Sequence, residues 1–347
     1  MNSVIRVEDA VTLDSPIFID MRSPEEYAVG HIPGAVNIPL FNDDERAKVG
    51  TIYKQMGAEE AKHLGLSIVS TKLPDIVGQA RQLHKSGRKV VVYCWRGGMR
   101  SKSIVNVLEM MGIAASQLLG GFKAYRQYVL DRLKTFEVKP VIVVLCGSTG
   151  TGKTIILNLL AQQNIPVIDL EKLANHRGSV FGQIGLGKPS TAQNFDAKLL
   201  MELDILNDQP YIVVECESKR IGNVYLPDSL FNAMRQGKKI LLSTNIEIRV
   251  DRLIEEYLDI YSNNQEAIIA SIESLRKRIG NKKTDQLLVD FNAGKIRDVV
   301  KILLLDYYDP MYGYEKAETT NYDSWVKADD VEQATDAIIQ YLQQFGR

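Results

Sequence analysis

One cysteine lies in a stretch rich in glycine and arginine, CWRGGMRS at residues 94–101. The apolar run 89–93 before it predicts a buried strand, and the apolar spacing over 101–111 predicts a helix. The cysteine is therefore expected on a strand-to-helix turn, where backbone N–H groups and the helix N-terminus favour an anion or a thiolate. We predict that Cys94 is a reactive thiolate and that the anion-binding residues are Arg96, Gly97, Gly98, Arg100 and Ser101.

The alternative for this stretch is an inert, buried cysteine, which is the commoner use of the residue. Arg96 and Arg100 argue against it, because charged side chains around a buried thiol need partners that the segment does not offer.

A second stretch, GSTGTGKT at residues 147–154, follows an apolar strand pattern over 141–146 and precedes a helical pattern over 155–162. This is the P-loop pattern in the context that it requires, so a chance glycine-rich turn is a poor explanation. Lys153 is expected to reach a terminal phosphate, and Thr154 offers a hydroxyl to Mg²⁺. The predicted phosphate-binding residues are Gly147, Ser148, Thr149, Gly150, Thr151, Gly152, Lys153 and Thr154.

Acidic residues end two further predicted strands of the same region. Asp169 follows the apolar run 165–168, and Glu215 follows 211–214. The ends of parallel strands meet at one edge of a sheet, so both are candidates to bind metal or to act as a catalytic acid beside the P-loop. The alternative for either residue is a helix cap.

Strands and helices alternate through both regions, which predicts an α/β protein with parallel, doubly wound sheets. We place a first domain at residues 1–135 and a P-loop domain with a helical C-terminal part at 136–347. Residues 41–62 are interpreted as a longer polar segment within the first domain.

Composition limits the classes of function. No apolar run of 18 residues and no signal peptide is visible, so no membrane partner is expected. The three cysteines and four histidines lack metal-ligand spacing, which argues against a structural metal and fits a reducing cytoplasm. Because the net charge is -1, a surface that binds RNA must be a local basic patch. Residues 1–135 carry 18 Lys and Arg against 14 Asp and Glu.

Two basic groups are candidates for such a patch. One comprises Arg46, Lys48 and Lys54, and the other Arg276, Lys277, Arg278, Lys282 and Lys283. The alternative for the second group is a solvated helix end.

The aromatic segment 306–314 is expected either to stack bases, to line an apolar groove or to belong to the core. Arg249 and Arg252, three residues apart, resemble the lid arginines of P-loop kinases.

The first domain resembles rhodaneses. The resemblance is carried by Asp20-Met21-Arg22, Glu26, the segment GHIPGA at 30–35, the Cys94 loop and LGGF at 119–122. It implies that Cys94 carries sulfur or a related chalcogen as a persulfide-type adduct. Asp20, Arg22 and His31 are interpreted as a hydrogen-bonded scaffold around the loop, and His31 is not expected to be a catalytic base.

The whole chain resembles the tRNA 2-selenouridine synthases, in the order of its two domains and in segments such as LANHRGS at 173–179 and ECES at 215–218. The resemblance implies that wobble 2-thiouridine in tRNA becomes 2-selenouridine. Geranyl diphosphate first alkylates the sulfur, and selenophosphate then supplies selenium. Expected partners are tRNA and an enzyme that supplies selenophosphate. The sequence leaves open whether the P-loop holds geranyl diphosphate, ATP or both.

Two other functions are compatible with parts of the chain. The spacing from Cys94 to Arg100 also matches cysteine phosphatases, although those usually carry a histidine where Tyr93 stands. The second alternative function is that of a non-catalytic protein that relays sulfur or binds RNA under nucleotide control. Phosphate release from a phosphotyrosine analogue tests the first, and a change in the tRNA nucleoside made by the protein alone tests the second.

Overall fold

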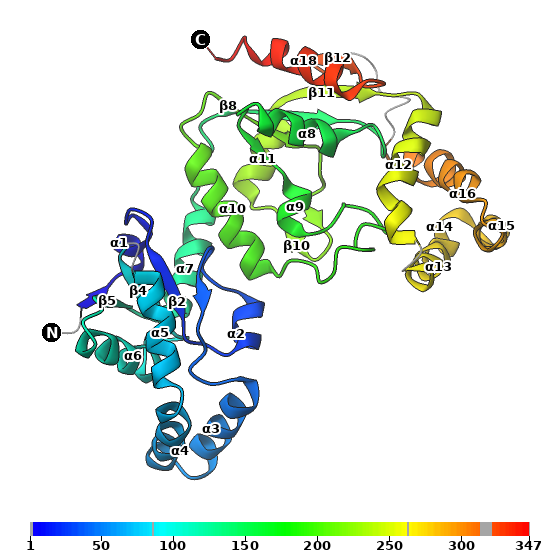
Figure 1. The fold of residues 1–347 in the computed structure, drawn as a ribbon. Helices are drawn as coiled ribbons and strands as arrows, with labels where there is room; N and C mark the ends of the chain where they lie inside the picture. The colour runs from blue at the N-terminus through cyan, green and yellow to red at the C-terminus, as the bar shows by residue number, and fades with distance from the viewer. Residues whose placement is uncertain (1–2, 85–86, 262–263, 313–320, 347) are drawn as a thin grey trace. The chain divides into compact units, whose positions relative to one another are not determined.

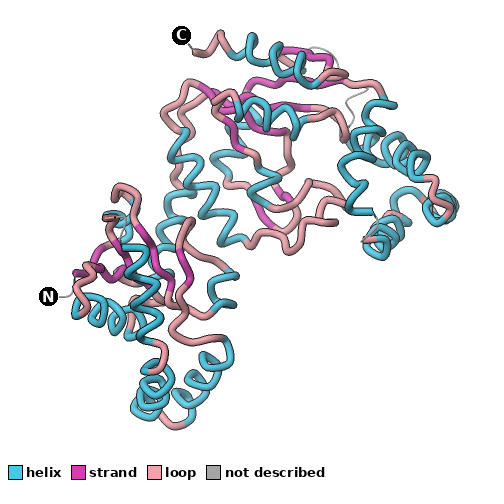
Figure 2. Tube along the Cα trace, viewed as in Figure 1, coloured by secondary structure: helices cyan, strands magenta, loops and turns pink. Residues whose placement is uncertain are grey.

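The computed structural model describes residues 3–84, 87–261, 264–312 and 321–346, and the chain forms two compact units (Figure 1). The segment up to Thr135 forms the first unit together with Thr191–Leu200. Phe136–Ser190 and the segment from Met201 onward form the second. Nothing in the sequence pattern indicated that Thr191–Leu200 packs with the first unit. Each unit contains its own sheet flanked by helices (Figure 2).

The sheet of the first unit has five parallel strands. In sheet order they are β1 (Ser3–Ile5), β5 (Ala115–Leu118), β4 (Val90–Tyr93), β2 (Ile17–Asp20) and β3 (Val36–Asn37). Val90 and Val92 pack under α5 (Leu73–His84) and α6 (Met99–Met110). Tyr93 points to the other face because side chains alternate along a strand, and it stacks near Phe122 of α7 (Gly121–Lys134). The short α1 (Val7–Val11) contacts α7.

The first unit has three more helices. α2 (Pro24–Val29) begins at Ser23 with a capping box, as the sequence predicted. α3 (Asp43–Gln55) and α4 (Ala58–Ser70) pack against each other, although we had interpreted residues 41–62 as a polar segment. α3 has a capping box from Asn42 and Glu45 but no fully buried side chain, so it lacks the apolar periodicity by which a helix is usually found.

The sheet of the second unit also has five parallel strands. Their order is β12 (Ser324–Lys327), β11 (Lys238–Ser243), β6 (Val141–Cys146), β8 (Tyr211–Glu215) and β7 (Val167–Ile168). α8 (Lys153–Gln162) and α18 (Val331–Leu342) share one core with these strands, and α11 (Asp228–Gln236) contacts β6. The second unit also has α9 (Leu170–Ala174) and the hairpin of β9 (Arg220–Ile221) and β10 (Val224–Tyr225). The helix α10 (Ala192–Leu206) begins in the first unit and ends in the second. The predicted α/β fold with parallel sheets is confirmed.

A helical part of the second unit follows β11, as predicted, and has its own core (Figure 1). It comprises α12 (Ile246–Tyr261), α13 (Gln265–Ser274), α14 (Arg276–Ile279), α15 (Asn281–Asn292), α16 (Ile296–Leu303), the π-helical turn η1 (Leu304–Tyr308) and α17 (Asp309–Tyr312). The chain then returns to the sheet as the edge strand β12, which we had not expected. Across the described ranges, no helix is both long and apolar enough to span a membrane.

Candidate functional site

Cys94 follows directly on β4 and lies at the base of the loop that leads into α6. Its side chain is 3% exposed. The backbone N–H of Gly98 donates to Sγ at 3.3 Å, and the Ser101 hydroxyl lies 3.3 Å from the same sulfur. These contacts, at the N-terminus of α6, suit a negatively charged sulfur or an anion bound above it.

Two glycines let the Cys94 loop close against the turn before α7. Gly97 has φ of 62°, and a Cβ there would lie 2.7 Å from the carbonyl oxygen of Leu118. Gly121 has φ of 58°, and its Cβ would lie 2.2 Å from the carbonyl oxygen of Cys94. Both positions therefore require glycine, which explains why the LGGF segment accompanies the cysteine loop.

The Gln117 side chain fixes the same loop from β5. Its Nε2 donates to the carbonyl oxygen of Gly97 at 2.7 Å and to the Ser101 hydroxyl at 3.0 Å. Gln117 is a residue that the sequence did not single out, because a lone glutamine in a strand has no distinctive spacing.

The two arginines of the loop differ in their surroundings. Arg96 is exposed. The Arg100 guanidinium instead pairs with Glu26, with Nη1 2.7 Å from Oε2. Burial alone would raise the pKa of Glu26, but the hydrogen bond and charge of Arg100 bring that pKa below its ordinary value. An anion above Cys94 would therefore compete with Glu26 for Arg100, whereas Arg96 has no carboxylate partner among the described residues.

Asp20 and Arg22 form a buried ion pair next to this loop. Arg22 Nη2 donates to Asp20 Oδ2 and to the carbonyl oxygen of Gly30, both at 2.5 Å. The guanidinium carbon lies 3.9 Å from the ring centre of Phe122, whose backbone N–H donates to the Cys94 carbonyl. These contacts are those of a scaffold.

The His31 ring packs on Tyr27. Its Nδ1 lies 3.0 Å from the carbonyl oxygen of Tyr27, and the two rings stack with centres 4.0 Å apart. Burial lowers the pKa of His31. The backbone N–H of His31 donates to Asn194, in the Thr191–Leu200 segment of the same unit.

The P-loop runs from the end of β6 to the start of α8. Gly150 and Gly152 have φ of 82° and 93°, which side chains rarely tolerate. Lys153 Nζ donates to the carbonyl oxygens of Gly147 at 2.7 Å and Ser148 at 3.3 Å. The lysine therefore lies across the mouth of its own loop, where a phosphate would meet it.

Arg249 and Arg252 of α12 hold the P-loop from outside. Arg249 Nε donates to the carbonyl oxygen of Thr149 at 2.9 Å, and its guanidinium forms a buried, bidentate pair with Asp309. Arg252 donates to the carbonyl oxygen of Thr151 at 2.9 Å. Both arginines thus bind the loop backbone, and their resemblance to the lid arginines of P-loop kinases stays a prediction.

The Arg249–Asp309 pair gives a stability prediction. Asp309→Ala leaves a buried guanidinium without its carboxylate and is expected to lower the free energy of unfolding of the second unit by about 3–5 kcal/mol. Denaturant unfolding of the full chain measures this. Asp306→Ala, which removes the exposed partner of Lys283, is the control and should cost less than about 1 kcal/mol. Equal effects of the two substitutions would contradict the assigned role of the buried pair.

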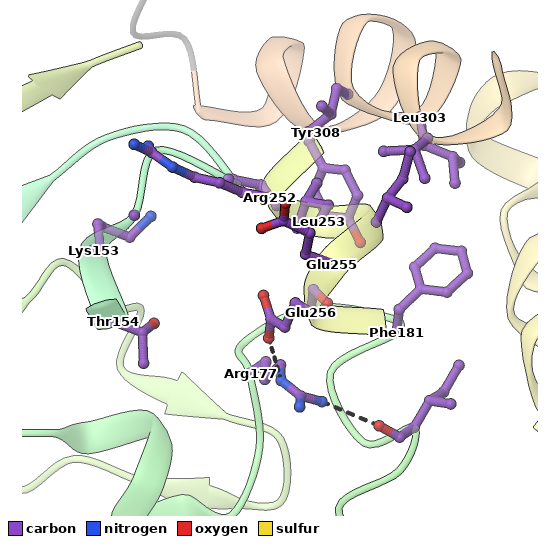
Figure 3. A pocket seen from close by; sticks show the side chains of 18 of the residues that line it. Lys153, Thr154, Arg177, Phe181, Arg252, Leu253, Glu255, Glu256, Leu303 and Tyr308 are labelled. Atoms are coloured by element: carbon purple, nitrogen blue, oxygen red, sulfur yellow. Dashed lines mark hydrogen bonds and ion pairs between the residues drawn. The ribbon is translucent and has the colours of Figure 1, made fainter. Parts of the chain in front are cut away.

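A cavity of about 740 Å³ opens beside the P-loop within the second unit. Lys153 and Thr154 lie at one side of it, and Phe181 and Leu303 at the other (Figure 3). The wall away from the P-loop is mostly apolar and belongs to the loop after α9 and to α12, α13, α15, α16 and η1; it includes Phe181, Ile184, Ile272, Phe291, Leu303 and Tyr308. The cavity therefore has the P-loop at one side and a mostly apolar wall at the other; Arg177, Ser179, Glu255 and Glu256 also line it.

The aromatic segment 306–314 contributes to this wall and to the core. Tyr308 lines the cavity, and Tyr307 is buried in the helical core, where its hydroxyl accepts a hydrogen bond from Arg278. Gly313 and Tyr314 lie outside the described residues.

The two acids predicted from the strand ends do not line the cavity. Asp169 caps α9, since its Oδ1 accepts the N–H of Lys172 at 2.8 Å. Glu215 is 2% exposed; its Oε1 accepts the N–H of Glu171 at 2.7 Å, and its Oε2 has no hydrogen-bond partner in the described part of the chain. Burial raises the pKa of Glu215 well above its ordinary value. Helix capping, the alternative that we considered, fits Asp169.

Two other glutamates, Glu171 and Glu217, line the cavity instead. Their carboxyl groups lie close together beside Gly178, where a Cβ would be 2.9 Å from Glu217 Oε1 and 3.1 Å from Glu171 Oε1. Thr154 Oγ1 donates to Glu171 at 3.5 Å. Burial raises the pKa of Glu217 to about 8, and the negative charge of Glu171 adds to this effect. Burial also raises the pKa of Glu171, although the positive charge of Lys153 acts in the opposite direction. Each lies two residues beyond a predicted acid, and that offset was not visible in the sequence.

The basic groups are placed on two surfaces. Lys48 and Lys54 are exposed on α3 and have no ion pair among the described residues, whereas Arg46 lies 3.7 Å from Glu26. In the second group, Arg276 pairs with Glu273 and Asp285, and Lys283 pairs with Asp306. Lys277 and Lys282 are exposed. The pairing of Arg276 and Lys283 is typical of a solvated helix end.

Comparison with known proteins matches both units to families. Residues 6–128 match the rhodanese-like domain, and residues 140–345 match the tRNA 2-selenouridine synthase AAA domain. The chain belongs to the tRNA 2-selenouridine synthase family. The tRNA 2-selenouridine synthase of Pseudomonas syringae pv. syringae (strain B728a) is 34% identical, over 88% of this chain and 90% of that protein. The one of Nitrosomonas europaea is 38% identical, over 74% and 68%.

Membership of the tRNA 2-selenouridine synthase family confirms the resemblance inferred from the sequence. Among solved structures, the N-terminal domain of a protein from Clostridium difficile 630 is 51% identical, over 37% of this chain and 99% of that chain, with a TM-score of 0.36.

Proposed function

We propose that this chain replaces the sulfur of wobble 2-thiouridine in tRNA with selenium, in two steps that use the two units. The names of its relatives support tRNA selenouridine modification. The observation that carries the two-step proposal is the cavity of the second unit, because it combines a P-loop with a long apolar wall. A nucleotide needs polar contacts around its base and ribose, whereas this wall suits a hydrocarbon.

In the first step, geranyl diphosphate binds with its diphosphate on the P-loop and its geranyl chain along Phe181, Ile272 and Leu303. The sulfur of 2-thiouridine attacks the carbon that bears the diphosphate, and the C–O bond electrons leave with the diphosphate. The N–H groups of 148–154 and the Lys153 ammonium stabilise the charge that develops on the leaving group.

Mg²⁺ is proposed to accompany the diphosphate. The Thr154 hydroxyl and a Glu171 carboxylate oxygen are the hard oxygen donors that Mg²⁺ prefers, and phosphate oxygens would complete its shell. The described residues gather no set of three or more His, Cys, Asp or Glu side chains that could hold a metal ion. Mg²⁺ would supply charge neutralisation.

In the second step, the Cys94 loop presents selenium to the geranylated base. The loop N–H groups and Arg96 hold the selenophosphate anion, with Arg100 contributing when it leaves Glu26. The selenium of selenophosphate is at the selenide level, so a selenosulfide on Cys94 would need a two-electron oxidant. The Cys94 thiolate instead attacks phosphorus, and the P–Se bond electrons leave with selenide. The selenide attacks C2, and geranylthiolate leaves; alkylation is what converts a poor leaving sulfur into a good one. Water then hydrolyses the S–P bond on Cys94, which releases phosphate and restores the thiol.

The proposal is tested by supplying the co-substrates separately to thiolated tRNA. Geranyl diphosphate alone should convert 2-thiouridine to its S-geranyl derivative, as seen by mass spectrometry of the nucleosides. Addition of ATP should not be required. A reaction that occurs with ATP and not with geranyl diphosphate would contradict the proposed use of the cavity.

Binding of tRNA is proposed to use both basic groups, because one wobble base must be presented to the diphosphate site and to Cys94. The exposed Lys48 and Lys54 give the clearest prediction. The double variant Lys48→Ala with Lys54→Ala should weaken tRNA binding and flatten the slope of log affinity against log salt by about 0.7–0.9 for each lost phosphate contact. Filter binding at several salt concentrations measures both quantities.

The control is Lys62→Ala, which removes an exposed lysine paired with Glu59 and should leave the salt slope unchanged. If the double variant has the wild-type slope, the α3 surface is not a tRNA contact.

A further inference from the structure

The β9–β10 hairpin of the second unit displays two side chains that the two-step reaction does not use. The antiparallel register pairs Arg220 with Tyr225 and Ile221 with Val224. Because side chains alternate along a strand, the two pairs lie on opposite faces of the hairpin. Ile221 and Val224 are buried on one face. Arg220 and Tyr225 are exposed on the other, and Tyr225 is 59% exposed.

The exposed Arg220–Tyr225 pair is held in a defined arrangement. The guanidinium carbon of Arg220 lies 5.8 Å from the centre of the Tyr225 ring, within the range of a cation–π contact. Arg220 Nε also donates to the carbonyl oxygen of Gly222 at 2.8 Å, which ties the guanidinium to the hairpin turn. Among the described residues, no carboxylate pairs with Arg220. The pair therefore offers an ordered aromatic ring and a positive charge, so little conformational entropy is lost when a ligand binds.

The hairpin is connected to the wall of the cavity through two segments. A Cβ on Gly222 would lie 2.7 Å from Cδ2 of His176, so the hairpin turn packs on the His176 ring in the segment that follows α9 (Figure 1). Arg177, the next residue, lines the cavity. Glu217, three residues before Arg220, lines it as well. The Arg220–Tyr225 pair is therefore close, along both segments, to the cavity in which the wobble base is proposed to react.

We propose that this pair binds the anticodon loop beside the wobble base. The Tyr225 ring stacks on an unpaired base next to the wobble base, and the Arg220 guanidinium contacts a phosphate of the same loop. The inference rests on the proposed function, which brings the wobble base of tRNA to this cavity. It adds an RNA contact of the second unit that is separate from the basic groups on α3 and α14–α15.

The chemistry of the pair favours RNA as the ligand. The bases of a single-stranded loop expose flat faces that stack on aromatic rings, and the adjacent phosphates carry the negative charge that an arginine complements. A stable protein–protein interface needs about 800 Å² from each partner. Two exposed side chains on a two-stranded hairpin supply far less, whereas they are sufficient to hold one nucleotide.

The two contacts should respond differently to salt, which separates them in binding experiments with the full chain and an anticodon stem–loop. Tyr225→Ala should weaken binding by about 5- to 150-fold, the usual effect of losing one base-stacking ring, and should leave the salt slope unchanged. Arg220→Ala should flatten the slope of log affinity against log salt by about 0.7, the value for one phosphate contact of a single strand. Tyr225→Phe keeps the ring and should bind like wild type.

Stacking is observed directly with two stem–loops that carry 2-thiouridine at the wobble position and the fluorescent base 2-aminopurine on its 5′ or its 3′ side. The wild-type protein and Tyr225→Phe should quench the fluorescence of one of them, and Tyr225→Ala should not. Matched controls are Trp325→Ala, which removes a 51% exposed aromatic ring of β12, and Arg235→Ala, which removes an exposed arginine of α11. Both controls should retain wild-type affinity, salt slope and quenching.

Wild-type affinity and quenching in Tyr225→Ala would overturn the inference and leave the hairpin as a surface for a protein partner. Absence of quenching by the wild-type protein with both stem–loops, or an unchanged salt slope in Arg220→Ala, would also overturn it. These measurements need no co-substrate, so they do not depend on S-geranylation. A wild-type protein that binds and quenches the stem–loop but does not alkylate 2-thiouridine with geranyl diphosphate would support the RNA contact and count against the proposed function.

Discussion

Replacing Cys94 by serine is expected to reduce 2-selenouridine formation to the level seen without protein, while S-geranylation continues at the wild-type rate. A serine keeps a polar atom near the Gly98 N–H and the Ser101 hydroxyl, so the loop should fold unchanged. Its hydroxyl, however, is a far weaker nucleophile than a thiolate and is not expected to displace selenide from the phosphorus of selenophosphate. Only the second step should therefore be lost.

Nucleoside mass spectrometry separates the two products, and in the Cys94→Ser reaction the S-geranyl nucleoside should accumulate. The control is Cys216→Ser, which removes a thiol outside the loop and should support both steps. Wild-type yields of 2-selenouridine from Cys94→Ser would show that selenium reaches the base without the Cys94 thiolate.

Lys153→Ala is expected to slow S-geranylation by about 10²–10³-fold, the usual effect of removing one preorganised group that stabilises a developing oxyanion. The ammonium lies at the mouth of the P-loop, 2.7 Å from the Gly147 carbonyl oxygen, where the departing diphosphate would replace that contact. Selenation should disappear only because its substrate is no longer made.

Supplying tRNA that already carries the S-geranyl group separates these effects. Lys153→Ala should convert this tRNA to the selenated form at the wild-type rate. Lys172→Ala, an exposed lysine of α9, controls for loss of a nearby positive charge and should leave both steps unchanged. If Lys153→Ala fails to selenate the geranylated tRNA, the P-loop also serves the second step.

The Cys94 loop shows how far local sequence can predict a site. The strand, the turn and the helix around Cys94 were all predictable, because β-branched runs, glycines with positive φ and helical apolar spacing are local signals. The partner of Arg100 was not, since Glu26 is 74 residues away along the chain. An ion pair between distant segments leaves no pattern in either segment.

The carboxylates beside the P-loop could also be predicted only in part from the sequence. The sequence located the two strands but not the direction of each side chain beyond them. Asp169 is used by the N-terminus of α9, and Glu215 still belongs to β8 and is buried, so the residues two positions later reach the cavity. The apolar wall was also hidden, because it comes from five helical segments whose apolar faces looked like ordinary core.

The most direct test of the two-step account is a pulse and chase on one preparation of the full chain with thiolated tRNA. Geranyl diphosphate is supplied first, the excess is removed, and selenophosphate is then added while nucleosides are followed by mass spectrometry. The account predicts that the S-geranyl nucleoside forms during the pulse and is converted to 2-selenouridine during the chase, with release of geranylthiol. Formation of 2-selenouridine from 2-thiouridine with selenophosphate alone, or an S-geranyl nucleoside that persists unchanged through the chase, would contradict it.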